Sequence, residues 1–240
     1  MKTNFLILSL FIVLLFGCSK DDDNNTEPEQ QPVELQLLNT LNNDDFILTY
    51  NPDKTVKKVA LYNNIYNLLY TYDQGRIKTI ESFYEGNNVL YTFSYAANGL
   101  IETFTIDGSE IDVDYDDVEN KYSYTDGEDI KRKFTLNDAG EIKKYEQDDS
   151  GNIESIVLLY DDAHKGPMYN SNNIAFQTTF VIPNVLDLIT AGITKRPLLT
   201  LSSTNTFISF ENTYDEQDFV TKAVPSNPNF KTSNYSYSQL

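Results

Sequence analysis

Apolar and polar residues alternate over short stretches of this chain, and each stretch ends in a turn-forming group. Tyr70 and Tyr72 alternate with smaller residues, and Asp73-Gln74-Gly75 follows them directly. Alternation with a period of two is typical of a half-buried β-strand, whereas Asp and Gly favour tight turns. Ile77 and Ile80 continue the apolar pattern beyond the turn. The stretch therefore predicts two antiparallel strands joined as a hairpin.

The same unit recurs along the first two thirds of the chain. Its starting positions are spaced by 20 to 23 residues and lie at Tyr50, Tyr72, Tyr95, Tyr115 and Leu136. A period of about 21 residues fits one hairpin with two strands of roughly eight residues. Successive hairpins predict an all-β fold, an antiparallel up-and-down meander of about 10–14 strands, strongly curled or closed like a barrel because open edges invite aggregation. We expect residues 34–240 to form this single domain.

The hairpin rhythm fails after residue 162 and returns near the end of the chain. Residues 163–173 are polar and predict a loop, 174–182 predict a strand or extended chain, and 183–192 predict a short helix. The segment 180–201 is the most apolar part of the chain after the first 18 residues, so we expect it to fill the concave face of the sheet. An exposed flap that holds a partner is the alternative. The alternating residues 234–238 predict a closing strand that pairs with Phe46–Tyr50.

Composition narrows the possible partners. The chain has 36 acidic and 18 basic residues and a net charge of −18, which disfavours binding to nucleic acid and to anionic lipid headgroups. A single Cys and a single His exclude an intrachain disulfide and leave no ligand set for a metal site built from Cys and His. We expect no cofactor.

The N-terminal residues resemble a lipoprotein signal. The apolar run Phe5–Phe16 is too short to span a membrane and fits the core of a signal peptide, which predicts a signal peptide over residues 1–17. Leu15-Phe16-Gly17-Cys18 resembles a bacterial lipobox, with Phe16 bulkier than the usual residue at its position. The resemblance implies that Cys18 carries acyl chains such as palmitate, which would hold the protein at a membrane.

The residues after this cysteine resemble an export signal. Lys20 and the acidic cluster Asp21, Asp22 and Asp23 are similar to the signal of Bacteroidetes surface lipoproteins, and a solvated linker is the alternative reading. Residues 24–32 lack apolar side chains, so we expect 18–33 to form a flexible acidic tether. The resemblance implies an outer-membrane protein exposed at the cell surface.

The repeat itself also resembles a known pattern. Tyr72-Asp73-Gln74-Gly75-Arg76 is similar to the YD repeats of Rhs-type and teneurin-type proteins. Together with the lipobox, the array resembles a family of Bacteroidetes lipoproteins that carry a domain of unknown function. That resemblance implies a large antiparallel sheet, curled or closed, and it supplies no catalytic residue.

Candidate chemistry is sparse. Asp112, Asp114 and Asp116 are weak metal candidates because the Gly and Glu of a calcium loop are replaced by Asp117 and Ser123. A solvated strand face explains the three carboxylates better. His164 lies in a polar loop and is expected at the surface rather than as a general base. The many acidic residues leave a glycosidase-type carboxylate pair open, although no pair is distinguished.

These features favour a non-enzymatic outer-membrane lipoprotein that acts as a binding or structural module. Its ligand would be a glycan, a peptide or a partner membrane protein. The runner-up is a carrier that holds an apolar ligand inside the curled sheet, and a hydrolase comes third. The carrier hypothesis requires an empty interior, the glycan hypothesis requires exposed aromatic residues, and the enzyme hypothesis requires polar groups that converge in a pocket.

Overall fold

The computed structural model describes residues 36–41, 46–62, 64–172, 174–182 and 193–239, all within the unit Glu34–Leu240. These residues form seventeen β-strands and one helix, α1 (Ala175–Thr178). The strands are β1 (Gln36–Leu41), β2 (Phe46–Tyr50), β3 (Val56–Leu61), β4 (Tyr66–Asp73), β5 (Arg76–Tyr84), β6 (Asn87–Tyr95), β7 (Ile101–Ile106), β8 (Ser109–Asp112), β9 (Asp114–Asp116), β10 (Lys121–Thr125), β11 (Lys131–Leu136), β12 (Ile142–Asp149), β13 (Asn152–Tyr160), β14 (Leu198–Ser203), β15 (Phe207–Tyr214), β16 (Val220–Pro225) and β17 (Ser233–Gln239).

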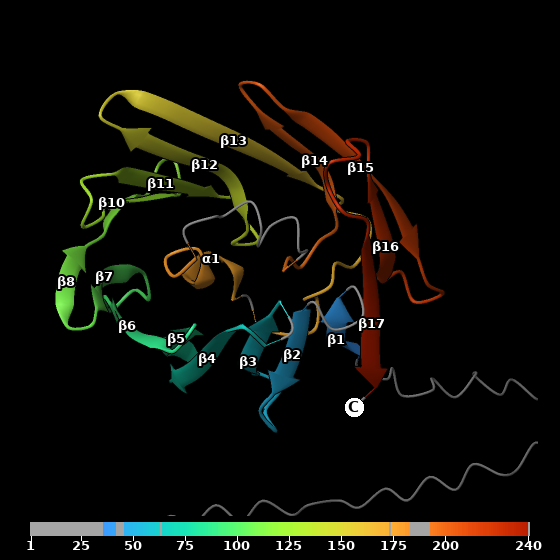
Figure 1. The fold of residues 1–240 in the computed structure, drawn as a ribbon, viewed down its shortest axis with the longest axis horizontal. Coiled ribbons are helices and arrows are strands. Elements are labelled where there is room, and N and C mark those ends of the chain that lie inside the picture. The colour runs from blue at the N-terminus through green and yellow to red at the C-terminus, as the bar shows by residue number, and fades with distance from the viewer. Residues whose placement is uncertain (1–35, 42–45, 63, 173, 183–192, 240) are drawn as a thin grey trace, which may run out of the picture. The chain divides into compact units, whose positions relative to one another are not determined.

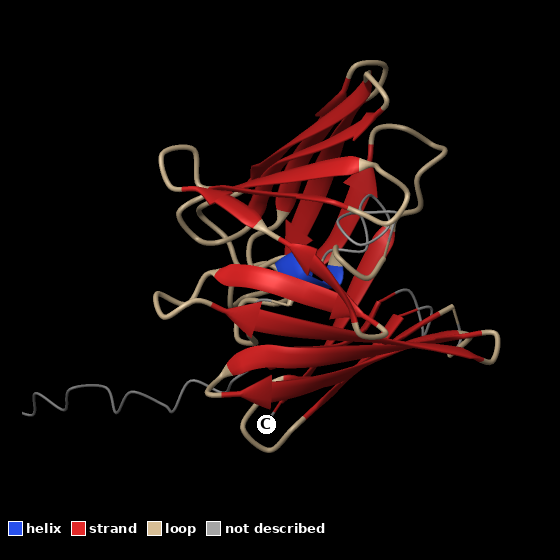
Figure 2. Ribbon diagram, turned by 90° about the vertical axis from the view of Figure 1, so that its left-hand side faces the viewer, coloured by secondary structure: helices blue, strands red, loops and turns tan. Residues whose placement is uncertain are grey.

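The strands pair in the order in which they follow one another along the chain. Antiparallel ladders join each strand to the next from β1 to β8 and again from β9 to β17. A further ladder joins β17 to β1, with Tyr237 opposite Leu38. Figure 1 shows these strands around α1, and Figure 2 shows the same helix between strands from a second direction. The all-β antiparallel prediction is confirmed, whereas strong curling or closure of the sheet stays a prediction.

Two details of the predicted meander are wrong. The described residues hold seventeen strands rather than the expected 10–14, partly because the stretch predicted as one strand at Ile111–Asp116 is divided between β8 and β9. The closing strand β17 pairs with β1 and not with the expected partner Phe46–Tyr50. Sequence alternation had not revealed β1, which lies next to β2 in the sheet.

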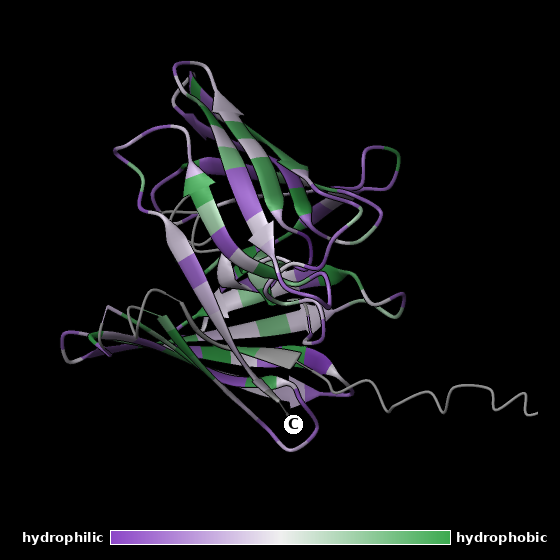
Figure 3. Ribbon diagram, turned by 90° about the vertical axis from the view of Figure 1, so that its right-hand side faces the viewer, coloured by the Kyte–Doolittle hydropathy of each residue, from purple (hydrophilic) through white to green (hydrophobic). Residues whose placement is uncertain are grey.

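Tight turns lie where the repeat pattern places them. Gln74 and Gly75 have φ angles of +49° and +76° and join β4 to β5 as a two-residue turn. Positive φ at both central positions matches the right-handed twist of the flanking strands, and Gly reaches that conformation without steric strain. Three more such turns have a Gly in second position, at residues 85–86, 107–108 and 150–151. Between these turns, apolar and polar residues alternate along the strands, as Figure 3 shows.

The tyrosines of the repeat connect neighbouring strands beyond the ends of their ladders. The phenol of Tyr72 donates a hydrogen bond of 2.7 Å to the carbonyl of Val56, although the β3–β4 ladder ends at Lys58 and Leu69. The same bond, here called a tyrosine brace, recurs between β1 and β2, β5 and β6, β12 and β13, and β16 and β17. Its donor and acceptor are Tyr50 and Leu38, Tyr95 and Ile77, Tyr160 and Ile142, and Tyr237 and Val220. At these five positions the tyrosine thus fastens its strand to the preceding strand, whereas the phenol of Tyr115 donates to Oδ1 of Asn120.

Removal of one brace tests its contribution to stability. Tyr95→Phe keeps the ring and removes the phenol that donates to Ile77 at 2.7 Å. We expect the free energy of unfolding to fall by about 1 kcal/mol, since the carbonyl loses a part-buried partner. Urea denaturation measures the change. Tyr169→Phe is the matched control because Tyr169 is 47% exposed, and an equal loss in both variants would contradict the brace.

Burial of the tyrosines predicts sensitivity to alkali. Burial raises the pKa of Tyr72, Tyr91 and Tyr95 from 10.0 to about 12. Because the folded pKa lies above the unfolded one, the resulting stability is complete below pH 10 and is lost as the pH rises from 10 to about 12. Urea midpoints should therefore fall over this range, together with a steep rise in tyrosinate absorbance. Tyrosinate absorbance that rises around pH 10 while the protein stays folded would contradict the prediction.

The segment after the polar loop folds differently from the prediction. Residues 174–182 were expected to be extended, but Ala175–Thr178 form α1. In the interior no ladder supplies partners for this backbone, so local bonds such as Thr178 N–H to Ile174 C=O replace them. Phe176 and Phe180 are one helical turn apart and both are buried. The helix expected at 183–192 lies outside the described residues.

The described ends of the apolar segment 180–201 are part of the core. Phe180, Val181, Ile182, Ile193 and Leu201 are each at most 9% exposed. These residues join one cluster with inward-facing residues of most strands. For the residues that the structure describes, the core prediction is confirmed and an exposed flap is excluded.

Candidate functional site

A cleft opens where one stretch of chain changes its strand partner. Residues of β8 pair with β7, and the N–H of Val113 still donates to Glu102 on β7 at 2.9 Å. From Asp114 onwards the chain forms β9 and pairs with β10, where Asp114 lies opposite Ser123. The structure gives no ladder between β8 and β10. The far edge of β8 therefore faces the end of β10 across a gap.

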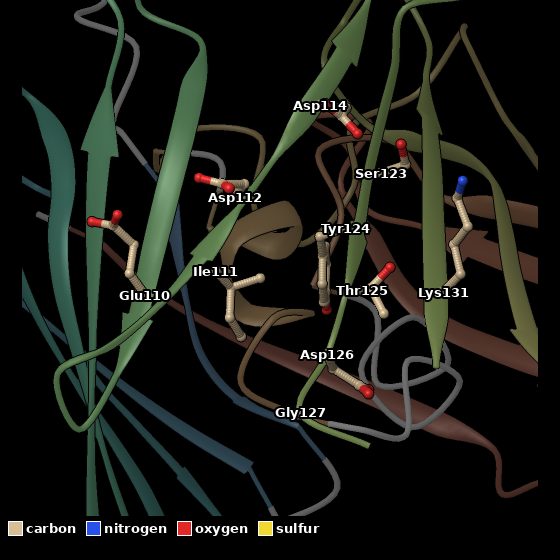
Figure 4. A pocket seen from close by; sticks show the side chains of 10 residues that line it. All are labelled: Glu110, Ile111, Asp112, Asp114, Ser123, Tyr124, Thr125, Asp126, Gly127 and Lys131. Atoms are coloured by element: carbon tan, nitrogen blue, oxygen red, sulfur yellow. The ribbon is translucent and has the colours of Figure 1, made fainter. Parts of the chain in front are cut away.

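The gap is a cavity of about 450 Å³, a volume within the range of ligand-binding clefts. Continuing the β9–β10 register would place Asp112 opposite Thr125 and Glu110 opposite Gly127. These residues lie on the two walls instead, as Figure 4 shows. The complete lining is Glu110, Ile111, Asp112, Asp114, Ser123, Tyr124, Thr125, Asp126, Gly127 and Lys131.

Backbone groups of both walls point across the cleft. The two-residue turn at 107–108 makes Ile106 and Ser109 a hydrogen-bonded pair, so alternation turns the N–H and C=O of Glu110 and Asp112 away from β7. On β10, the N–H of Asp126 donates to Ile130 at 3.0 Å, and alternation turns the backbone of Thr125 away from β11. The walls thus resemble two edges of a sheet from which one strand has been left out.

Carboxylates surround the opening, and an apolar floor lies beneath it. Glu110, Asp112 and Asp114 are exposed and, within the described residues, form no ion pair. Asp126 differs because its Oδ2 lies 2.9 Å from Nε of Arg132 and its Oδ1 accepts backbone N–H groups of its own turn. Lys131 is the one basic residue of the lining. The upper part of the cleft is therefore acidic.

The floor of the cleft is continuous with the aromatic core. Tyr124 is 5% exposed, and its ring stacks on Phe180 with centroids 4.9 Å apart. Burial raises the pKa of Tyr124 far above its ordinary value, despite the opposing effect of Arg132. Its phenol therefore stays protonated at neutral pH and is suited to packing rather than to proton transfer. The cleft offers a ligand free backbone hydrogen-bonding groups, carboxylates and an apolar floor. Such groups are suited to binding a ligand.

The structure separates the three predicted metal candidates. Asp112 and Asp114 line the cleft, but Asp116 does not. Its Oδ1 accepts the N–H groups of Val118 and Glu119, both at 3.1 Å, and so closes a turn. Across the described ranges, no group of three His, Cys, Asp or Glu residues could hold a metal ion. Cys18, Lys20 and Asp21–Asp23 lie outside those ranges.

A second polar cluster fastens the loop after β13. Nδ1 of His164 lies 2.7 Å from Oδ2 of Asp161, to which the phenol of Tyr214 also donates at 2.8 Å. The imidazole ring stacks on that tyrosine with centroids 3.9 Å apart. Partial burial opposes ionisation of Asp161, but the N–H of Ala163 and these two side chains outweigh it and lower its pKa. The contacts of His164 hold the loop against β15, which is a structural role.

Sequence reasoning had assigned Asp112 and Asp114 to one strand face but had not located the cleft. The alternation from Ile111 to Asp116 is unbroken in the sequence, and nothing in it marks the change of partner at Val113. Thr125 is the last residue of β10 and Gly127 lies in the turn after it, where the pair Asp126-Gly127 was the available signal.

Comparisons with known proteins give no family for this chain. No protein-family model matches it, and the curated proteins contain no match. A porin-like protein from Bacteroides vulgatus aligns with 82% of this chain and 88% of its own, with a TM-score of 0.37 and 12% identity. A porin-like protein from Bacteroides uniformis aligns with 81% and 90%, with a TM-score of 0.39 and 14% identity. Scores this low assign neither family nor function.

The described helix content is limited to α1, and no helix among these residues is long and apolar enough to cross a membrane.

Proposed function

We propose that this protein is a non-enzymatic binding module, held at the outer membrane by a lipid on Cys18, and that its ligand binds in the cleft between β8 and β10. The observation that carries the proposal is an open cleft with unpaired strand edges, beside a core in which the described aromatic residues pack against one another. The unpaired backbone N–H and C=O groups of such edges readily form hydrogen bonds with a ligand or with another chain. The pairing of β17 with β1 supports a curled or closed sheet as the scaffold for this site.

The alternative functions have less support. A carrier needs room inside the sheet, but α1 lies among the strands (Figure 1). The rings of Phe176 and Phe180 contact aromatic rings on β10 and β11. A glycan-binding site needs exposed aromatic rings, and Tyr124 in the cleft lining is only 5% exposed. A hydrolase needs an acid and a base that converge on one point. In the cleft, Asp126 is held by Arg132 and by its own turn, and the phenol of Tyr124 is suited to packing.

The anchor is tested separately from the binding site. Cys18→Ser should move the protein from the membrane fraction to the soluble fraction and abolish incorporation of labelled palmitate, because acyl chains supply the membrane affinity. Replacing Asp21, Asp22 and Asp23 by Asn should reduce protease accessibility on intact cells while membrane attachment persists. A Cys18→Ser protein that stays in the membrane would refute the lipid anchor.

The binding function is tested with the full-length protein in a nonionic detergent. Arrays of glycans, lipids and short peptides are screened against it and against a variant with Glu110→Gln, Asp112→Asn and Asp114→Asn. We expect a ligand that binds the native protein and binds the variant at least about tenfold more weakly. Ligands that bind both proteins equally would place the binding site elsewhere, and no ligand from any class would overturn the proposal.

A further inference from the structure

Exposed apolar side chains gather on the outer side of β13, β14 and β15. Five of the eleven large apolar side chains that are exposed in the described part of the chain lie on these three strands. They are Ile153, Val157, Leu159, Leu199 and Phe207. Single exposed apolar residues are normal on any protein, whereas a contiguous group of them is typical of a contact surface.

Strand pairing brings four of these residues together in one patch, here called the apolar face, which consists of Val157, Leu159, Leu199 and Phe207. Val157 lies opposite Ser202, and Ser202 lies opposite Phe207, so the three side chains form one row across the strands. Leu159 lies opposite Thr200 in the next row. The register shifts beside Leu199, which is left 38% exposed. The apolar face is therefore contiguous.

The positions between and beside these residues are uncharged. Ser155, Thr200, Ser202 and Ser209 share the outer side with the apolar face. The next strand, β12, differs because Lys144 and Glu146 lie opposite Val157 and Ser155 and pair with each other at 3.0 Å. An apolar medium can cover the apolar face without stripping water from a charged side chain, which would be costly.

The size of the apolar face disfavours a second copy of the chain as its partner. Four side chains with exposed fractions between 38% and 66% amount to a few hundred Å² of surface. A stable interface between two proteins buries about 800 Å² on each partner. A smaller surface suffices for a bilayer that another attachment already holds close, because two linked attachments reinforce each other.

We propose that the apolar face rests on the membrane that carries the lipid anchor, with Leu159, Leu199 and Phe207 inserted among lipids whose headgroups have no net charge. The inference rests on the proposed lipid on Cys18. The 18 residues from Cys18 to the start of β1 at Gln36 span at most about 60 Å, and a compact domain of about 200 residues is roughly 40 Å across. The apolar face is thus within reach of the bilayer. The net charge of −18 selects against anionic headgroups.

This contact gives the cleft a defined orientation. β8 and β14 lie on different sides of α1 in Figure 1. A membrane that covers β13, β14 and β15 therefore leaves the cleft between β8 and β10 open to a ligand.

The test uses the absence of Trp from the native chain, because one introduced tryptophan then reports only its own surroundings. Phe207→Trp places it in the apolar face, and Leu90→Trp, at a residue that is 43% exposed on β6, is the matched control. Each full-length protein is extracted from membranes and inserted into phosphatidylcholine vesicles with or without brominated acyl chains, which quench tryptophan on contact. We expect the emission of Phe207→Trp to shift to the blue and to fall at least about twofold with bromine, while that of Leu90→Trp stays nearly unchanged.

Vesicle flotation separates the ways in which the inference can fail. A protein that floats with the vesicles but shows no quenching of Phe207→Trp keeps the anchor and overturns the contact at the apolar face. A protein that does not float has no lipid anchor, which overturns both. Blue-shifted emission without quenching would mean that another part of the chain or a second copy covers the apolar face, and would overturn the lipid contact.

Polar substitutions test the neighbouring side chains. Leu159→Asn with Leu199→Asn in the Phe207→Trp protein should reduce the quenching about threefold, because an amide opposes insertion into lipid. Val118→Asn in the same protein, at a residue that is 91% exposed in the turn after β9, should leave the quenching unchanged. Urea denaturation checks that the variants remain folded. Equal quenching in the two variants would overturn the inference.

Discussion

Phe180→Ala is expected to lower the free energy of unfolding by about 3–5 kcal/mol, the range for truncation of a well-packed buried aromatic residue. Phe180 is 7% exposed and its ring is the centre of an aromatic cluster. Five ring centroids lie 4.9 to 5.7 Å from its own, those of Phe93, Phe104, Tyr124, Phe134 and Phe176. The truncation leaves a cavity that the rings on β6, β7, β10, β11 and α1 can close only partly.

Urea denaturation measures this loss, and Phe207→Ala is the matched control. Phe207 is 66% exposed on β15, so its removal is expected to change the stability by no more than about 0.5 kcal/mol. Phe180→Leu should give an intermediate loss because it retains part of the buried volume. If Phe180→Ala cost no more than Phe207→Ala, the segment around α1 would not be part of the folded core.

Hairpins were predictable from the sequence because their turns are local. Asp73-Gln74-Gly75 determines its own backbone conformation, and the alternation on either side fixes which face of each strand is buried. The repeat spacing then extends the same reasoning to the following strands. The role of the repeated tyrosine was harder to predict, since the brace from Tyr72 to Val56 depends on a bond between strands.

Features that depend on distant parts of the chain were not predictable. The residues of α1 include β-branched and aromatic neighbours that favour a strand, but their interior position lacks a ladder partner and favours a local helix. The pairing of β17 with β1 joins the two ends of the domain, and no local pattern records it. The cleft depends on the same kind of information, because the register of β8 and β10 is set by separate hairpins.

A buried carboxylate holds the loop before β14 against the turn that follows β11. Glu141 is 2% exposed, and its Oε1 accepts the backbone N–H groups of Lys195 and Arg196 at 2.9 and 3.0 Å. Its Oε2 lies 2.5 Å from Nε of the same arginine. Gly166 packs so closely here that a Cβ would lie 2.6 Å from the backbone of Arg196. One carboxylate thus joins a turn of the repeat to a loop that the repeat pattern does not cover.

Glu141→Ala is expected to lower the free energy of unfolding by about 3 kcal/mol, because it leaves Nε of the part-buried Arg196 and two backbone N–H groups without their acceptor, while Asp162 still pairs with the same guanidinium. Glu141→Gln should cost less, since its amide oxygen still accepts the N–H groups of Lys195 and Arg196. Denaturation in urea gives both values.

Glu119→Ala is the control for this prediction. Glu119 pairs with Lys121 at the surface, where its side chain is 58% exposed, so water and salt screen the pair and its loss should change the stability little. High salt should weaken that pair and leave the buried site almost unchanged, because counterions screen exposed charges much more than buried ones. The prediction would be wrong if Glu141→Ala lost no more stability than Glu119→Ala, or if its loss disappeared in high salt. Either result would mean that solvent replaces the carboxylate. Packing around Gly166 would then hold the two segments together.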